Sequence, residues 1–239
     1  MRILEGKKVT KHFGGLAALH YVDFDIKQGE VVGLIGPNGA GKTTLFNLIS
    51  GSLPTTAGEI RYKGKKITGL KPHQICKMGV ARTFQSAQLF AGLTVFENAL
   101  AASLFGKKRS ISVPDAEREA MELLEFVELS PVSTMLAKDL PVANQKRLEV
   151  ARALATKPEL LLFDEVMAGL NPTEVAQVME LIIKIRNTGV TLFLIEHVMK
   201  AIMSICDRII VLHHGEKIEE GTPQEIAASQ KVVEVYLGE

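Results

Sequence analysis

The chain contains no tryptophan, only two cysteines and no excess of one charge. Its 28 Lys and Arg residues against 27 Asp and Glu residues leave a net charge of +1, so nucleic acid is not an expected partner. Cys76 and Cys206 lie far apart and form no C-x-x-C pair. We therefore expect reduced thiols rather than a disulfide or a metal site. No apolar run approaches the ~20 residues that a membrane helix needs, so the chain is expected to be soluble.

What the chain does contain is an alternation of apolar strands with helices. Its 239 residues, 46% of them apolar, suffice for one large α/β domain or for one domain with an insertion. Continuous apolar runs at 160–163 and 190–195 are typical of buried parallel strands. Residues 7–35 and 59–67 instead show short strands separated by glycine-containing turns.

Residues 93–157 differ from the rest of the chain. They lose the strand pattern, and Ala116, Ala120 and Leu124 recur at helical spacing. The sequence therefore predicts one α/β unit over residues 1–239. Its core has a mainly parallel sheet and an N-terminal antiparallel β subdomain (1–92 and 158–239), and its helical insertion subdomain is 93–157.

Residues 36–43 form a complete G-x-x-x-x-G-K-[ST] phosphate-binding loop, between an apolar run and a helix-like segment. Its glycines let backbone N–H groups surround a phosphate. Lys42 can reach the β- and γ-phosphates, and the Thr43 hydroxyl can ligate Mg²⁺. The predicted nucleotide-binding residues here are Gly36, Pro37, Asn38, Gly39, Ala40, Gly41, Lys42, Thr43 and Thr44.

A pair of adjacent carboxylates indicates which phosphate reaction the loop serves. The apolar run 160–163 ends directly in Asp164 and Glu165. Asp164 can hold Mg²⁺, and Glu165 can polarise a water for attack on the γ-phosphate, which is worth roughly 100- to 10,000-fold in rate. A phosphate loop alone is shared by kinases, GTPases and ATPases, but together with the acidic pair it favours ATP hydrolysis.

With these motifs in this order, the chain resembles the ATP-binding cassette family over nearly its whole length. The resemblance implies a P-loop NTPase fold, a single nucleotide-binding domain, and ATP and Mg²⁺ as cofactors. It implies that Phe13 stacks on the adenine, that Gln85 links the nucleotide site to a membrane subunit, and that His197 contacts the γ-phosphate. The implied metal ligands are Thr43, Gln85 and Asp164, and the implied catalytic residues are Glu165, His197 and Gln85.

One element departs from the family pattern. The signature Leu-Ser-Gly-Gly-Gln, which completes the other subunit's ATP site in a head-to-tail dimer, is replaced by Leu140 and then Pro141, Val142, Ala143 and Asn144. Pro141 has neither a hydroxyl nor an N–H, and the next two residues add Cβ atoms. We expect a weakened contact to the partner's ATP and therefore favour a heterodimer, with a homodimer as the alternative.

Within the family, the chain is most similar to ATPases that take up branched-chain or other hydrophobic amino acids. The stretches that carry this similarity are 13–19, 79–85, 93–98, 167–172 and 195–199. The similarity implies a peripheral protein at the cytoplasmic face of the inner or plasma membrane. Its implied partners are a second ATPase, two permease subunits and, indirectly, a solute-binding protein. Similar subunits serve the import of urea or short amides.

The permease is expected to dock beside Gln85, with Leu89 and Phe90 as candidate contacts. Three other functions remain open from the residues alone. A regulatory subunit with weak hydrolysis would explain the altered signature segment, although Glu165 and His197 argue against it. A soluble cassette acting on DNA or ribosomes would need a basic excess or a second cassette, and a P-loop kinase would leave the acidic pair unexplained.

Overall fold

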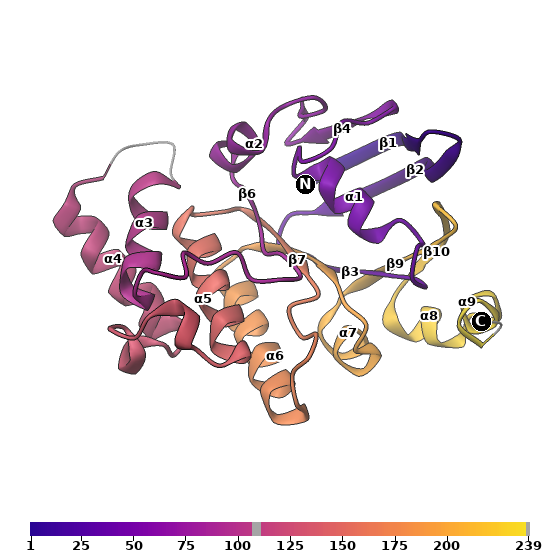
Figure 1. Ribbon diagram of the computed structural model, residues 1–239. Coiled ribbons are helices and arrows are strands. Elements are labelled where there is room, and N and C mark those ends of the chain that lie inside the picture. The colour runs from indigo at the N-terminus through magenta and orange to yellow at the C-terminus, as the bar shows by residue number, and fades with distance from the viewer. Residues whose placement is uncertain (107–110, 238–239) are drawn as a thin grey trace.

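The computed structural model describes residues 1–106 and 111–237, and two sheets organise them (Figure 1). The larger sheet has the strand order β10-β9-β3-β8-β7-β6. All its neighbouring strands run parallel except the antiparallel pair β9–β10. Its strands are β3 (Val31–Ile35), β6 (Val80–Arg82), β7 (Leu160–Asp164), β8 (Thr191–Ile195), β9 (Arg208–His213) and β10 (Glu216–Gly221).

The smaller sheet is antiparallel and comes from the N-terminal quarter of the chain, with the order β2-β1-β4-β5. Its first two strands are 12 residues each, longer than the short runs expected from the sequence. Register shifts interrupt their pairing, and such bulges break the alternation by which a long strand is recognised. The strands are β1 (Arg2–Phe13), β2 (Leu16–Lys27), β4 (Ala57–Tyr62) and β5 (Lys65–Lys66).

Helices cover the larger sheet, and their ends follow local capping chemistry. The Asn171 side chain accepts from the backbone N–H groups of Thr173 and Glu174, and Thr222 caps in the same way. The C-terminal segment forms two helices, because Ser229 adopts an extended conformation between them. The helices are α1 (Lys42–Ile49), α2 (Pro72–Met78), α6 (Pro172–Asn187), α7 (Met199–Ile205), α8 (Pro223–Ala228) and α9 (Gln230–Leu237).

Three further helices, α3 (Val95–Phe105), α4 (Val113–Phe126) and α5 (Val142–Ala155), pack against one another at the end of the molecule opposite the antiparallel sheet (Figure 1). Ala116, Ala120 and Leu124 are fully buried, as their spacing predicts. The predicted fold class is confirmed. The domain boundaries remain a prediction, and residues 107–110 of the helical segment, like 238–239, lie outside the described residues.

The larger sheet separates two hydrophobic cores. Val31 and Ile35 of β3 face one core, while Val32 and Leu34 face the other, because successive side chains of a strand point to opposite faces. The strand β7 alternates in the same way. Both faces of the sheet are therefore covered by apolar packing.

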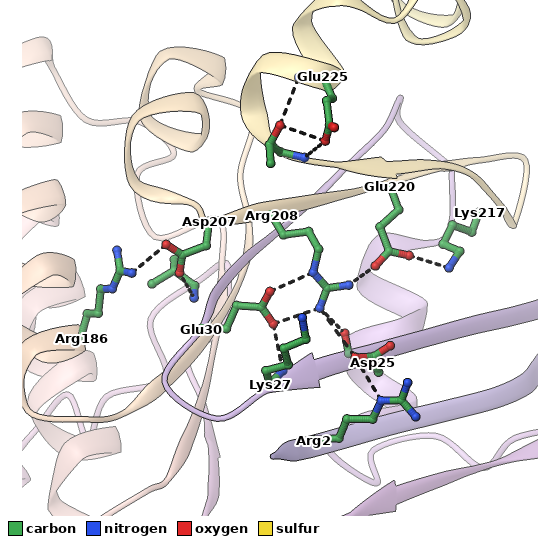
Figure 2. A network of polar contacts seen from close by, with 12 residues as sticks. Arg2, Asp25, Lys27, Glu30, Arg186, Asp207, Arg208, Lys217, Glu220 and Glu225 are labelled. Carbon is green, nitrogen blue, oxygen red and sulfur yellow. Dashed lines mark hydrogen bonds and ion pairs between the residues drawn. The ribbon is translucent and has the colours of Figure 1, made fainter.

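A polar network anchored on Arg208 joins the two sheets (Figure 2). The Arg208 guanidinium donates at 2.9 Å to each oxygen of Glu30 and at 2.7 Å to the carbonyl of Asp25 on β2. It also pairs with Glu220 of β10. The bidentate contact with Arg208 holds the pKa of Glu30 below its ordinary value, although burial works against this. The network fixes the antiparallel sheet against the edge of the parallel one.

Candidate functional site

The phosphate-binding loop connects the buried strand β3 to helix α1, and its backbone packs closely against neighbouring strands. A Cβ at Gly36 would lie 2.1 Å from the backbone oxygen of Leu212 on β9. At Gly41, where φ is +103°, a Cβ would lie 2.5 Å from the backbone oxygen of Ala18 on β2. Both positions therefore require glycine, and the loop is held between the two sheets.

Lys42 opens helix α1, and its side chain is folded back over the loop. Nζ donates to the carbonyls of Gly36 (2.6 Å) and Pro37 (2.8 Å) and is buried. A pocket of about 170 Å³ lies over the loop, where backbone N–H groups and a helix N-terminus favour an anion. Its lining comprises Ala18, residues 38–44, Glu165 and His197.

Glu165 is held from two sides at the edge of this pocket. Its Oε1 lies 2.9 Å from Nε2 of His197, and its Oε2 accepts a hydrogen bond of 2.7 Å from Nε2 of Gln85. Its backbone is left-handed (φ 53°), a conformation that a non-glycine residue rarely adopts. The three residues follow the adjacent strands β7, β8 and β6, so the parallel sheet brings them together.

Asp164, the last residue of β7, makes a buried ion pair. Arg82 donates to Oδ2 at 2.6 Å, and its guanidinium also donates to Asn47 of α1 and to Ser50, the C-cap of that helix. Within residues 1–106 and 111–237, Asp164 Oδ1 is buried with no hydrogen-bond partner. A hydroxyl, an amide oxygen and this carboxylate oxygen are ligands that Mg²⁺ prefers. The donor set of Thr43, Gln85 and Asp164 therefore fits the metal.

A second buried carboxylate lies next to the site. Glu196 Oε1 accepts from the backbone N–H of Met167 at 2.8 Å and is 2% exposed. Burial raises the pKa of Glu196 to about 7, against the opposing effects of the Met167 and His197 N–H groups and of Lys146. The turn after β7 is thereby tied to the end of β8.

Comparison with known proteins decides the family. The family model described as "ABC transporter" matches residues 19–168. The high-affinity branched-chain amino acid transport ATP-binding protein BraF of Pseudomonas aeruginosa is 43% identical over 99% of this chain and 98% of its own length. The chain belongs to the ABC transporter family. This confirms the predicted resemblance, including that to the branched-chain amino acid ATPases, and the predicted class of enzyme, an ATPase.

Solved cassettes share the whole fold. An ATP-binding cassette of an ABC transporter in its ADP conformation superimposes with a TM-score of 0.90, at 33% identity and full coverage of both chains. A dimeric cassette bound to ADP and Pi superimposes with a TM-score of 0.84, at 29% identity over 92% of this chain and 99% of that one. Binding of adenine nucleotides and dimerisation are therefore properties of this family. A second model, "Branched-chain amino acid ATP-binding cassette transporter", matches residues 216–239.

Five residues predicted for the nucleotide and metal site of this cassette do not line its pocket: Phe13, Gly36, Pro37, Gln85 and Asp164. The segment Pro141–Asn144, predicted to face the ATP of another subunit, does not line it either. Phe13 ends β1 with 47% of its surface exposed, before the turn into β2. The segment Pro141–Asn144 begins helix α5, where Pro141 is the N-cap without a side-chain cap and Val142 is 56% exposed. Both are open to contact from outside, Phe13 by a ligand ring and Pro141–Asn144 by another subunit.

A groove of about 310 Å³ lies between the α/β core and the helical segment of the cassette. Phe84 and Gln88, on either side of Gln85, contribute to it, together with Ile75 of α2 and Glu149 and Arg152 of α5. Leu89 packs partly into the core, while Phe90 is half exposed beneath Arg152, whose guanidinium carbon lies 4.6 Å from the ring centroid. No described helix, over 1–106 and 111–237, is long and apolar enough to cross a membrane.

The sequence did not predict a role in the site for three charged residues: Arg82, Lys146 and Glu196. Arg82 lies three residues before Gln85, and Glu196 directly precedes His197. Lys146 belongs to a basic stretch that a helical pattern assigns to solvent, yet it is 4% exposed. The one sequence feature that could have indicated their role is that each lies close in sequence to a motif residue.

Proposed function

We propose that this cassette binds ATP with Mg²⁺ and hydrolyses it with Glu165 as the general base. The observation that carries the proposal is the Glu165 carboxylate, which borders the phosphate pocket while Gln85 and His197 fix both its oxygens. A carboxylate so placed can take the proton of a water that attacks the γ-phosphate. His197, at Nε2, orients this carboxylate.

The other predicted residues hold the substrate. The N–H groups of residues 36–44 and the Lys42 ammonium bind the phosphates, and Phe13 stacks on the adenine. Thr43, Asp164 and Gln85 would hold Mg²⁺, which supplies positive charge to neutralise the phosphate oxygens when it is bound. Lys42 then exchanges its present carbonyl partners for phosphate oxygens.

We propose that the energy of ATP powers uptake of branched-chain amino acids at the cytoplasmic face of a membrane. Two similarities support this solute: the relative BraF, named for branched-chain amino acid transport, and the model for such transporters over residues 216–239. An ATPase subunit does not itself touch the solute, so import of urea or short amides is the alternative. Transport assays of the whole complex distinguish the two.

The partner of this chain is proposed to be a second, different ATPase. In a head-to-tail dimer, Pro141–Asn144 would face the partner's ATP, and Pro141 has no N–H to offer. Each hydrogen bond lost to a charged phosphate oxygen costs about 1.5–3 kcal/mol. A homodimer would carry this defect in both sites, whereas a heterodimer leaves the site of this chain to be completed by its partner's segment.

The permease is proposed to insert a short helix into the groove between α2, β6 and α5. Ile75 and Phe84 offer apolar contact and Arg152 a cation for an acidic helix end. Because Gln85 lies in the same loop as Phe84 and Gln88, a helix seated there would displace the residue that contacts Glu165. Docking and hydrolysis would thus share one loop.

The segment Pro141–Asn144 also favours a second candidate function, a nucleotide-binding regulatory subunit with weak hydrolysis. Loss of the signature serine and glycines reduces contact with the partner's nucleotide. Against this stands the intact contact set of Glu165, which a subunit that does not hydrolyse ATP has no reason to keep. Measured hydrolysis decides between the two.

The test is the ATPase rate of the chain alone and mixed with candidate partner ATPases, each with wild-type Glu165, with Glu165→Gln and with the surface control Glu180→Gln. We expect activity to need a partner, and Glu165→Gln to lower it by roughly 100-fold or more while nucleotide binding persists. Strong activity of the chain alone would contradict the heterodimer. Binding without hydrolysis in every mixture would favour the regulatory subunit.

A further inference from the structure

Lys146 occupies an unusual position for a lysine. It lies in the second turn of α5, yet its side chain is 4% exposed and points into the site. Nζ donates to the backbone carbonyl of Gln85 at 3.2 Å and to that of Glu165 at 3.1 Å. The two acceptors belong to the very residues whose side chains bond to each other. One ammonium group therefore clamps both backbones of the Gln85–Glu165 contact.

The same face of α5 holds the rest of the loop that contains Gln85. Glu149 accepts from the backbone N–H groups of Phe84 (3.1 Å) and Gln88 (3.3 Å). Arg152 donates to the carbonyl of Gln88 and covers the ring of Phe90. Lys146, Glu149 and Arg152 follow one another at intervals of three residues, so one helix face fixes the loop over residues 84–90.

The chemistry of the contact suits a lysine. Two carbonyl oxygens from separate segments need a donor with at least two hydrogens on one atom at the end of a long stem, which an ammonium on four methylenes supplies. Burying this cation is costly unless partners compensate it. Burial raises the pKa of both Glu149 and Glu196, and the charge of Lys146 opposes this rise in each. Both carboxyl groups are therefore within electrostatic reach of the buried ammonium.

Glu165 also has a constrained backbone. With φ at 53°, its peptide must be held by its neighbours, and its N–H donates to Ile195 while its C=O accepts from Lys146. The Glu165 carbonyl also accepts from the N–H of Ala168 at 3.1 Å. Together these three contacts set the direction in which the carboxylate leaves the main chain. Loss of the Lys146 contact would leave the left-handed turn less constrained and let the carboxylate shift relative to the phosphate pocket.

We propose that Lys146 is a positioning residue, which sets the geometry of Glu165 and Gln85 from the helix that begins with Pro141–Asn144. This inference rests on the proposed role of Glu165. Val142, the first residue of α5, is four residues before Lys146. A shift of α5 when its first turn meets the partner's nucleotide is therefore passed to the backbone of the general base. Lys146 does not line the phosphate pocket. It acts on the Glu165 carboxylate, directly through the Glu165 backbone and indirectly through Gln85.

The test uses Lys146→Met in whichever preparation of the chain, alone or with a partner, hydrolyses ATP. We expect kcat to fall by about 10- to 100-fold, since small displacements of a reacting group cost this much, while KM for ATP and binding of a fluorescent ATP analogue change by less than about threefold. Lys146→Arg, which keeps a branched cationic donor, should recover part of the rate. Arg147→Met, which removes the neighbouring cation from its contacts with Glu128 and Gln177, is the matched control.

A double-mutant cycle separates positioning from general loss of structure. If Lys146 acts through Glu165, Lys146→Met lowers the residual rate of Glu165→Gln by less than about twofold, because the group that it positions is already gone. Equal fold losses in both backgrounds, or an unchanged kcat in Lys146→Met, would overturn the inference. If Lys146→Met does not fold, Lys146→Gln is measured by the same criteria. An inactive wild type would instead refute the proposed function.

Discussion

Gln85 and Glu165 are joined by a hydrogen bond of 2.7 Å, although 80 positions separate them in the chain. With His197 on the other oxygen, both sides of the carboxylate are occupied. Each carboxylate oxygen keeps a further lone pair for a proton from water, so the two contacts fix the direction of the carboxylate without blocking it. The contact therefore makes the loop that carries Gln85 a part of the catalytic step as well as of the proposed permease groove.

Replacement of His197 by alanine should remove the group that orients Glu165. We expect His197→Ala to lower kcat by about 10- to 100-fold, with nucleotide affinity nearly unchanged, because the carboxylate loses one of its two fixed contacts. Steady-state hydrolysis and nucleotide titration measure the two effects. The exposed His73 on α2 gives the control, His73→Ala. A kcat for His197→Ala equal to that of the control would refute the role.

The buried oxygen of Asp164 predicts a changed metal requirement. Asp164→Asn replaces an anionic ligand by a neutral amide, so the Mg²⁺ concentration for half-maximal hydrolysis should rise by about tenfold or more. A Mg²⁺ titration at saturating ATP measures this. Asp139→Asn, at an exposed position, should leave the titration unchanged. A curve for Asp164→Asn that overlays the wild type would exclude Asp164 as a ligand.

Glu196 predicts a pH dependence of stability. Its pKa is about 7 in the native state against an ordinary 4.5, so the native protein binds more protons than the unfolded chain between these values. The free energy of unfolding must therefore fall as the pH rises from about 4.5 to about 7, by up to about 3 kcal/mol from this group. Glu196→Gln, which keeps an acceptor for Met167, should lack this fall. Urea unfolding of both proteins at pH 5 and pH 7.5 measures the difference, and parallel pH profiles would contradict it.

The Arg208 network predicts a large loss of stability (Figure 2). Arg208→Met leaves Glu30 without its bidentate partner, and we expect a loss of about 2–4 kcal/mol at neutral pH. Because the pKa of Glu30 is lowered, this contribution is present above about 4.5 and disappears as the pH falls below it. Arg186→Met is the control, since its pair with Asp207 is roughly 40% exposed on both sides and is worth less than about 1 kcal/mol. Equal losses for the two variants would contradict the prediction.

The sequence was sufficient to predict those features whose residues lie close together in the chain. The phosphate loop and the apolar strand before Asp164 each carry their own chemistry within a few residues. The parallel order of the strands then follows, and with it the meeting of residues at their carboxyl ends. The fold class and the family could be predicted for this reason, whereas the roles of the site residues stay predictions.

What the sequence could not provide depends on partners far along the chain. Arg82 bonds to Asp164, 82 positions away in the chain. Lys146 bonds to Gln85 over a separation of 61 positions, and Arg208 to Glu30 over 178. A helical or strand pattern assigns such charged residues to solvent, because periodicity records which face is apolar and not which cation has a buried acceptor. The lengths of β1 and β2 were missed for a related reason, since bulges shift their alternation.

The position of β3 within its sheet has a consequence for synthesis of the protein. Its neighbours are β8 and β9, so the strand that carries the phosphate loop stays unpaired until β8, which ends at Ile195, has been synthesised. The antiparallel pair β1–β2, in contrast, can close as soon as it emerges. A nascent chain therefore presents a folded N-terminal sheet beside an open, apolar strand edge, which is a template for aggregation. Chains released before Thr191 should precipitate or be degraded, and none of them should retain nucleotide.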